Sequence, residues 1–204
     1  MNLNVLQPKK AVESAFKKPN VPLALILVVL PSLASIASSI VFGAPFKVEN
    51  AVYSIVLAYV AFFVLAFVIF ALVAILKGSE AKGKMAGYLS ALSLVKIASL
   101  AIVLLSVVAI PLCFSPAAMN AVAAAANETS PGIAVGMAAA FVEENPNAIN
   151  WPLFSVFLAI AAIILILGAY LVFLGIKKLS NTGWLGAVAL AIIAFIIMGV
   201  LPVI

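Results

Sequence analysis

The side chains that most often do chemistry in proteins are scarce in this sequence. It has no histidine, one cysteine (Cys113) and six carboxylates, all of them glutamates. No carboxylate falls inside a long apolar run, and the pair Glu143 and Glu144 is adjacent rather than spaced around a site. The pattern matches no metal-ligand cluster, no nucleophile with its base and no glycine-rich phosphate loop. We therefore expect a protein that is not an enzyme and that has no cofactor and no metal site.

Lys96 is the one lysine that the sequence places inside an apolar run. It follows Tyr88 by about two turns of helix at 1.5 Å per residue. An isolated ammonium group in hydrocarbon is costly, so such lysines snorkel, pair with an anion or line a polar cavity. Two interpretations stay open. Lys96 either binds a lipid phosphate or lines a cavity open to the cytoplasm, or its long side chain only reaches up to the interface.

Two pairs of lysines precede the first apolar run. Between them, Val12, Ala15 and Phe16 share one face of a short helix. We expect this helix to lie on the cytoplasmic leaflet, with its apolar face down and its lysines on anionic head groups. The alternative is a charged collar that only fixes orientation. The predicted lipid or anion contacts are Lys9, Lys10, Lys17, Lys18 and Lys96.

Composition determines the class of protein. Of the 204 residues, 67% are hydrophobic and 8% are charged, whereas soluble domains average about 45–50% apolar and about 25% charged residues. The apolar excess must face lipid. The net charge of +5 comes from eleven lysines that lie mostly between apolar runs. Such lysines report orientation in a membrane, so we expect no nucleic-acid partner.

Five continuous apolar runs predict an all-α integral membrane protein with about five transmembrane helices in a single membrane domain, 1–204. Each run meets the roughly 20 residues needed to cross about 30 Å of hydrocarbon as a helix. Continuous runs, rather than alternating ones, exclude the strands of a membrane barrel. The spans cover about Val21–Phe42 (21–42), Ala51–Leu76 (51–76), Tyr88–Phe114 (88–114), Pro152–Ile176 (152–176) and Gly183–Ile204 (183–204).

The charges of the connecting segments predict the orientation. Lysines concentrate in segment 1–20, in the loop after the second run and in the loop after the fourth run. The remaining connections carry one lysine, Lys47, together with most of the glutamates. The positive-inside rule then places the N-terminus in the cytoplasm. Five crossings leave the C-terminus outside the cell membrane.

Local signals predict where some helices begin. Asn20 can cap the first span and Asn50 the second, because a side-chain oxygen there accepts from a free backbone N–H. The segment 115–151 is expected to form a small extracytoplasmic helical hairpin. Its first helix covers Ala117–Ala126 and its second covers Ile133–Val142.

Three segments together resemble proteins of the Yip1-domain family, in its prokaryotic branch. The first is Leu6–Pro19, with a proline, an Ala/Phe-bearing turn and a second proline before the membrane. The others are the glycine-bearing loop Lys82–Tyr88 and the last hairpin, Tyr170–Lys178. The resemblance implies five spans with the N-terminus inside and the C-terminus outside. It implies no catalytic residues, and the family's eukaryotic members act in vesicle trafficking.

We therefore expect a non-enzymatic Yip1-like membrane protein that organises lipids or partner proteins. Its partners would be anionic head groups on the cytoplasmic side and a membrane protein or a second copy of the chain. The alternative is a small transporter or channel subunit with a cytoplasm-facing cavity around Lys96.

Overall fold

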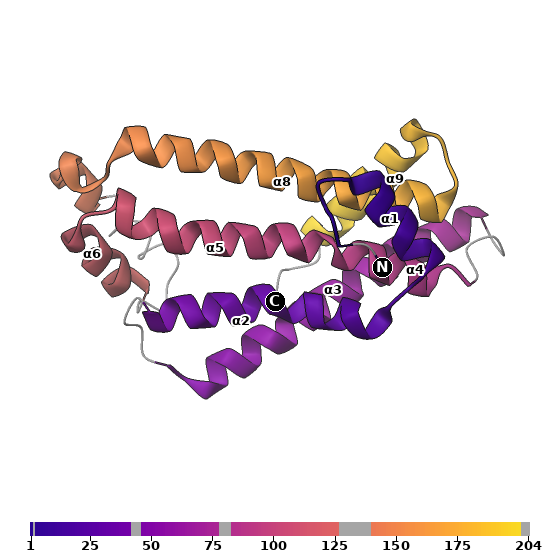
Figure 1. Cartoon of the computed structure of the whole chain (residues 1–204), viewed down its shortest axis with the longest axis horizontal. Coiled ribbons are helices and arrows are strands. Elements are labelled where there is room, and N and C mark those ends of the chain that lie inside the picture. Colours follow the sequence, from indigo (N-terminus) through magenta and orange to yellow (C-terminus); the bar gives the residue numbers. More distant parts are fainter. Residues whose placement is uncertain (2, 42–45, 78–82, 127–139, 201–204) are drawn as a thin grey trace.

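The structure is a computed structural model that describes residues 1, 3–41, 46–77, 83–126 and 140–200, and over these residues its regular elements are helices (Figure 1). This confirms the predicted all-α class. In chain order the elements are α1 (Pro8–Lys17), α2 (Val21–Val41), α3 (Val48–Lys77), α4 (Met85–Ser93), α5 (Val95–Cys113), α6 (Pro116–Ala126), η2 (Pro146–Ala148), α8 (Trp151–Ser180) and α9 (Trp184–Val200).

The helices form a bundle with two distinct ends (Figure 1). One end carries α1, α4 and the last turns of α8, and we call it the α1 end. The opposite end carries α6, and we call it the α6 end.

Four helical stretches are long and apolar enough to cross a membrane. They are α2, most of α3, the combined stretch Met85–Cys113 and α8. At 1.5 Å per residue they measure roughly 31 to 45 Å, against about 30 Å of hydrocarbon. The chain thus has the helices of a multi-pass membrane protein. The predicted fifth run coincides with α9, which is apolar and has 17 residues from Trp184 to Val200. Residues 201–204 of that run lie outside the described residues.

The third predicted run is longer than expected and is not one uniform helix. It begins at Met85, and a turn at Leu94 separates α4 from α5. The Ser93 hydroxyl donates to the Ser90 carbonyl over 2.9 Å, and the Leu94 N–H bonds the carbonyl three residues back rather than four. Serine hydroxyls compete in this way with the helical hydrogen-bond pattern and bend helices.

Helices α5 and α8 form an antiparallel pair, and contacts near both ends of the pair fix how the two helices are aligned. At the α6 end the Asn150 N–H donates to the Cys113 carbonyl over 2.7 Å, and the Ser115 N–H donates to the Ala148 carbonyl over 2.9 Å. Further along, a Cβ placed on Gly168 would lie 3.5 Å from the Ala98 Cβ. Small residues on α8 therefore let the two helices approach closely.

The helix starts follow the predicted caps only in part. The Asn20 side chain accepts a hydrogen bond from the Leu23 N–H over 3.0 Å and caps α2 as expected. The prediction for Asn50 is wrong, because α3 begins at Val48 and Asn50 lies within its first turn. In segment 115–151, α6 coincides with the first predicted helix. Most of the second predicted helix, Ile133–Val142, lies outside the described residues, and its last three residues are helical.

Two buried clusters lie toward the α1 end. The main cluster joins α2, α3, α4, α8 and α9 around Tyr88, Ile69 and Ile176, and the second joins α1, α4 and α8. At the α6 end Cys113 and Ile149 are buried, but α8 buries no residue between Trp151 and Leu167. This exposed apolar part of α8 is suited to contact with lipid.

Candidate functional site

Helix α1 is present as predicted, but its apolar face contacts protein rather than lipid. Pro8 opens the helix, and Ala11, Val12 and Ala15 are buried against Ala91 and other residues of α4 and α8. The expectation that this face lies on the leaflet is therefore corrected. Three small side chains can pack closely on a groove between two helices, and burial there removes their apolar area from water or head groups.

Two contacts fix the C-terminal half of α1. A Cβ placed on Gly87 of α4 would lie 2.9 Å from the Phe16 ring and 3.0 Å from the Phe16 Cα, so only glycine admits this approach. Beyond the helix, the backbone N–H of Asn20 donates to the Ser90 hydroxyl over 3.0 Å. Because Ser90 and Gly87 belong to the same short helix, α4 positions both α1 and the start of α2.

The four N-terminal lysines lie on the outer side of α1. All four are exposed, while the residues between them on the opposite side are buried. An open groove runs along this outer side. It is lined by Lys10, Glu13, Ser14, Lys17 and Lys18.

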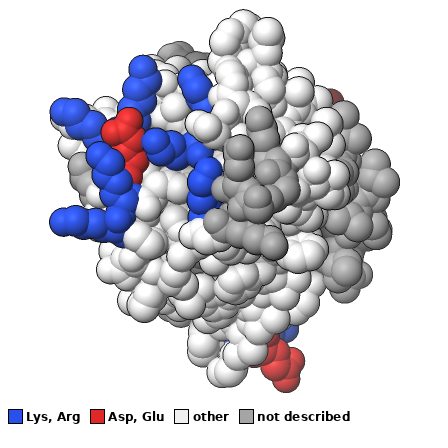
Figure 2. Space-filling view, turned by 90° about the vertical axis from the view of Figure 1, so that its right-hand side faces the viewer, with Lys and Arg blue, Asp and Glu red and all other residues white. Residues whose placement is uncertain are grey.

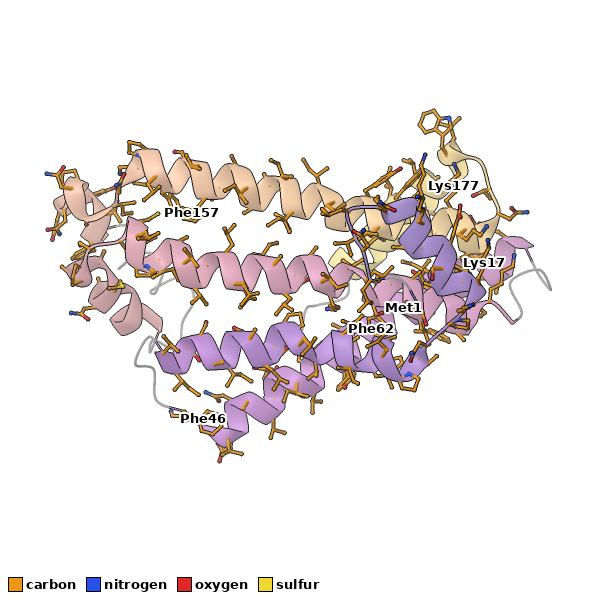
Figure 3. All side chains as sticks on the ribbon, viewed as in Figure 1. Met1, Lys17, Phe46, Phe62, Phe157 and Lys177 are labelled. Carbon is orange, nitrogen blue, oxygen red and sulfur yellow. The ribbon has the colours of Figure 1, made fainter. Side chains whose placement is uncertain are left out.

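Further lysines lie at the same end of the bundle. Lys84 precedes α4, and Lys177 and Lys178 lie in the last turn of α8. Figure 3 places Lys17 and Lys177 at this end, and Figure 2 shows the cations gathered toward one side of it. Among the described residues near them, Glu13 is the carboxylate of this end. Glu49 lies in the first turn of α3, and Glu143 and Glu144 lie beyond α6.

Lys96 stands apart from this lysine-rich surface. It is the second residue of α5 and is half-buried. Along the helix it follows Lys84 by about 18 Å at 1.5 Å per residue, and it does not line the groove on α1.

The structure thus brings the four N-terminal lysines to the same end of the bundle as Lys84, Lys177 and Lys178, which the sequence had assigned only to orientation. The sequence did contain one indication for Lys178. Its spacing from Leu171 and Leu174 places the three residues on one face of the helix, so a packed face at the two leucines predicts a lysine beside it.

A second groove has a different character. It is lined by apolar side chains of α3 and by the first residue of α4, namely Phe63, Val64, Phe67, Val68 and Met85. Like the other exposed apolar side chains of α3, these are suited to lipid tails rather than to polar ligands.

The chemistry available at the α1 end is electrostatic. In the part of the chain that the structure describes, no group of three or more histidine, cysteine or carboxylate side chains is placed to hold a metal ion. Exposed ammonium groups attract phosphates and carboxylates as point charges. Comparisons of the chain with protein-family models, with curated proteins and with solved structures find no match.

Proposed function

We propose that the protein is a non-enzymatic, Yip1-like membrane protein that organises anionic lipids, and through them partner proteins or further copies of itself, at the inner face of the cell membrane. The observation that supports this is the lysine-rich surface on α1. The apolar face of the helix packs on protein, so its lysines point outward. Anionic lipid surfaces attract such lysines by about 1 kcal/mol each.

The proposal includes an orientation with five crossings. The lysines of the α1 end face the cytoplasm, and the α6 end, with Lys47, Glu49, Glu143 and Glu144, faces outward. The support is the charge asymmetry between the two ends of the described bundle. The fifth crossing would be α9, which follows α8 after a short turn and would carry the C-terminus outward.

Native mass spectrometry of the protein in nanodiscs of phosphatidylcholine and phosphatidylglycerol tests the proposal. We expect phosphatidylglycerol to be retained in excess of its share of the bilayer. The variant Lys10→Gln/Lys17→Gln/Lys18→Gln should lose this preference by roughly fivefold per lysine, from about 1 kcal/mol each. Lys47→Gln, which removes an exposed lysine at the α6 end, is the matched control and should retain phosphatidylglycerol like the wild type. Equal retention of both lipids by the wild-type protein would refute the proposal.

A second candidate function is favoured by the half-buried position of Lys96 just after the turn at Leu94. An interrupted helix beside a buried cation is a feature of membrane transport sites. In this role Lys96 would bind an anion on a path open to the cytoplasm. Lys96→Ala should then abolish anion flux into proteoliposomes, and unchanged flux would remove Lys96 from any such mechanism.

A further inference from the structure

The packing of α1 shows which lysine of α8 lies on the side that faces it. Leu171 of α8 lies in the cluster with Ala11 and Ala15 of α1, and Leu174 packs on the same cluster. Lys178 follows Leu174 by four residues, so it lies one turn further along the same side of α8. It is therefore on the α1 side of the helix and, being exposed, reaches beyond the cluster.

Helix α4 packs against both α1 and α8. Its Gly87 contacts Phe16 of α1, and a Cβ placed on Gly175 of α8 would lie 3.6 Å from the Tyr88 ring of α4. The C-terminal turns of α1 and α8 lie at the same end of the bundle, where Figure 3 labels Lys17 and Lys177. Lys18 and Lys178 follow these two residues directly in the sequence.

Helix dipoles alone do not account for these lysines. One lysine in the last turn is enough to offset the partial negative charge of a helix C-terminus. Here α1 ends in Lys17 and Lys18, and α8 ends in Lys177 and Lys178. Like charges gathered at one end of the bundle repel one another, and Glu13, one turn before Lys17, can offset only one of them. An anion bound by these lysines would reduce that repulsion.

The surroundings favour an anion that belongs to a lipid. Trp184 opens α9 directly after the turn that follows α8, and it is 62% exposed. Leu185 beside it is 66% exposed. Exposed tryptophan next to an apolar side chain is typical of the head-group level of a bilayer, where phosphate groups also lie. Lys177 and Lys178 at the end of α8 are close in sequence to Trp184 and therefore lie near this level.

We propose that the phosphate group of an anionic phospholipid binds to the lysines at the C-terminal ends of α1 and α8, namely Lys17, Lys18 and Lys178, and holds α1 on the bundle. This rests on the proposed function and adds a consequence to it. The buried face of α1 is built mainly from Ala11, Val12 and Ala15, so its hold on the bundle is modest. Anionic lipid keeps α1 docked, and a neutral membrane releases it.

Cysteine reactivity measures the docking. Ala15, which is 0% exposed, is replaced by cysteine in a Cys113→Ala background. Labelling by N-ethylmaleimide is followed in vesicles of phosphatidylcholine, with and without phosphatidylglycerol. Gln7→Cys, exposed at the start of α1, corrects for effects of the membrane charge on thiol reactivity. If Ala15→Cys folds poorly, Val12→Cys at 2% exposure replaces it.

We expect phosphatidylglycerol to slow labelling at the buried site, relative to Gln7→Cys, by roughly fivefold for each lysine that the phosphate engages. Lys17→Gln/Lys18→Gln/Lys178→Gln should remove this protection. Equal relative rates in both vesicles, or protection that persists in the triple variant, would overturn the inference. Protection by inorganic phosphate added to neutral vesicles would assign the site to a free phosphate and overturn the lipid assignment.

The two proposals fail in different ways. If native mass spectrometry shows lysine-dependent retention of phosphatidylglycerol but Ala15→Cys reacts equally in both vesicles, the lipid-organising function stands and the docking role is wrong. If phosphatidylglycerol is not retained, the function itself is refuted.

Discussion

Tyr88 carries a polar group that the core does not satisfy. Its side chain is 0% exposed, and its hydroxyl has no hydrogen-bond partner among the described residues. A buried hydroxyl without a partner costs about 1–3 kcal/mol. Tyr88→Phe keeps the ring against Gly175 and removes the hydroxyl. We expect the variant to be as stable as the wild type or more stable, by up to about 2 kcal/mol, in denaturant unfolding in detergent micelles.

Tyr59 provides the matched control for this prediction. Its hydroxyl donates to the Leu25 carbonyl over 3.2 Å and so links α3 to α2. Tyr59→Phe should destabilise the protein by about 0.5–1.5 kcal/mol, the usual net value of a hydrogen bond. If Tyr88→Phe destabilises the protein to the same extent, the Tyr88 hydroxyl has a hydrogen-bond partner, such as a buried water, and does not lower the free energy of unfolding.

Single residues were predictable from sequence when their role is local. The cap at Asn20 depends on an oxygen three residues before Leu23, and it was predicted. The roles of Gly87 and Ser90 depend on the packing of α1 against α4, which brings residues about 70 positions apart into contact. No local sequence pattern predicts such a contact. For the same reason Lys178 was predicted only as an orientation signal.

At the scale of elements, α1 depends on the absence of a side chain at Gly87. Gly87→Ala places a methyl group 2.9–3.0 Å from Phe16, including its backbone, so one of the helices must shift. Overpacking of this kind costs about 1–3 kcal/mol. We expect lower stability to denaturant, and we expect faster labelling of a cysteine at Ala15 because α1 is pushed from its groove.

Gly168 on α8 is the control for that change. A Cβ there would meet the Ala98 Cβ at 3.5 Å, an ordinary contact. Gly168→Ala should therefore be neutral or should stabilise the protein by up to about 1 kcal/mol, because alanine favours a helix over glycine. Equal effects of the two substitutions would show that the contact between α1 and α4 is not tight.

Most of the helices could be predicted from the sequence, because long apolar runs predict membrane-spanning helices and prolines often stand at the start of a helix. Helix α1 and the four long apolar stretches follow from such signals. Two features could not be predicted from such signals. The turn at Leu94 comes from serine hydroxyls inside an apolar run. The apolar face of α1 is equally compatible with contact to lipid and with contact to protein. Only the groove between α4 and α8 decides between these.

At the scale of the whole molecule, the two buried clusters and most of the described lysines share the α1 end, while α8 exposes apolar side chains toward the α6 end. A bilayer that covers these apolar side chains would place the lysines of the α1 end at one head-group layer. The two ends would then lie on opposite sides of the membrane. Residues 7 and 143 are separated by α2, α3 and the α4–α5 stretch, three stretches that are each long enough to cross.

Side-specific labelling tests this arrangement. In a Cys113→Ala background, Gln7→Cys marks the α1 end and Glu143→Cys marks the α6 end, and both positions are exposed. A membrane-impermeant maleimide should label Glu143→Cys on intact cells and should label Gln7→Cys only after permeabilisation, because lysines are retained on the cytoplasmic side. Labelling of both from one side would mean that one of the three stretches does not cross. The reverse pattern would place the lysine-rich surface outside, where an inner-leaflet phosphate could not hold α1.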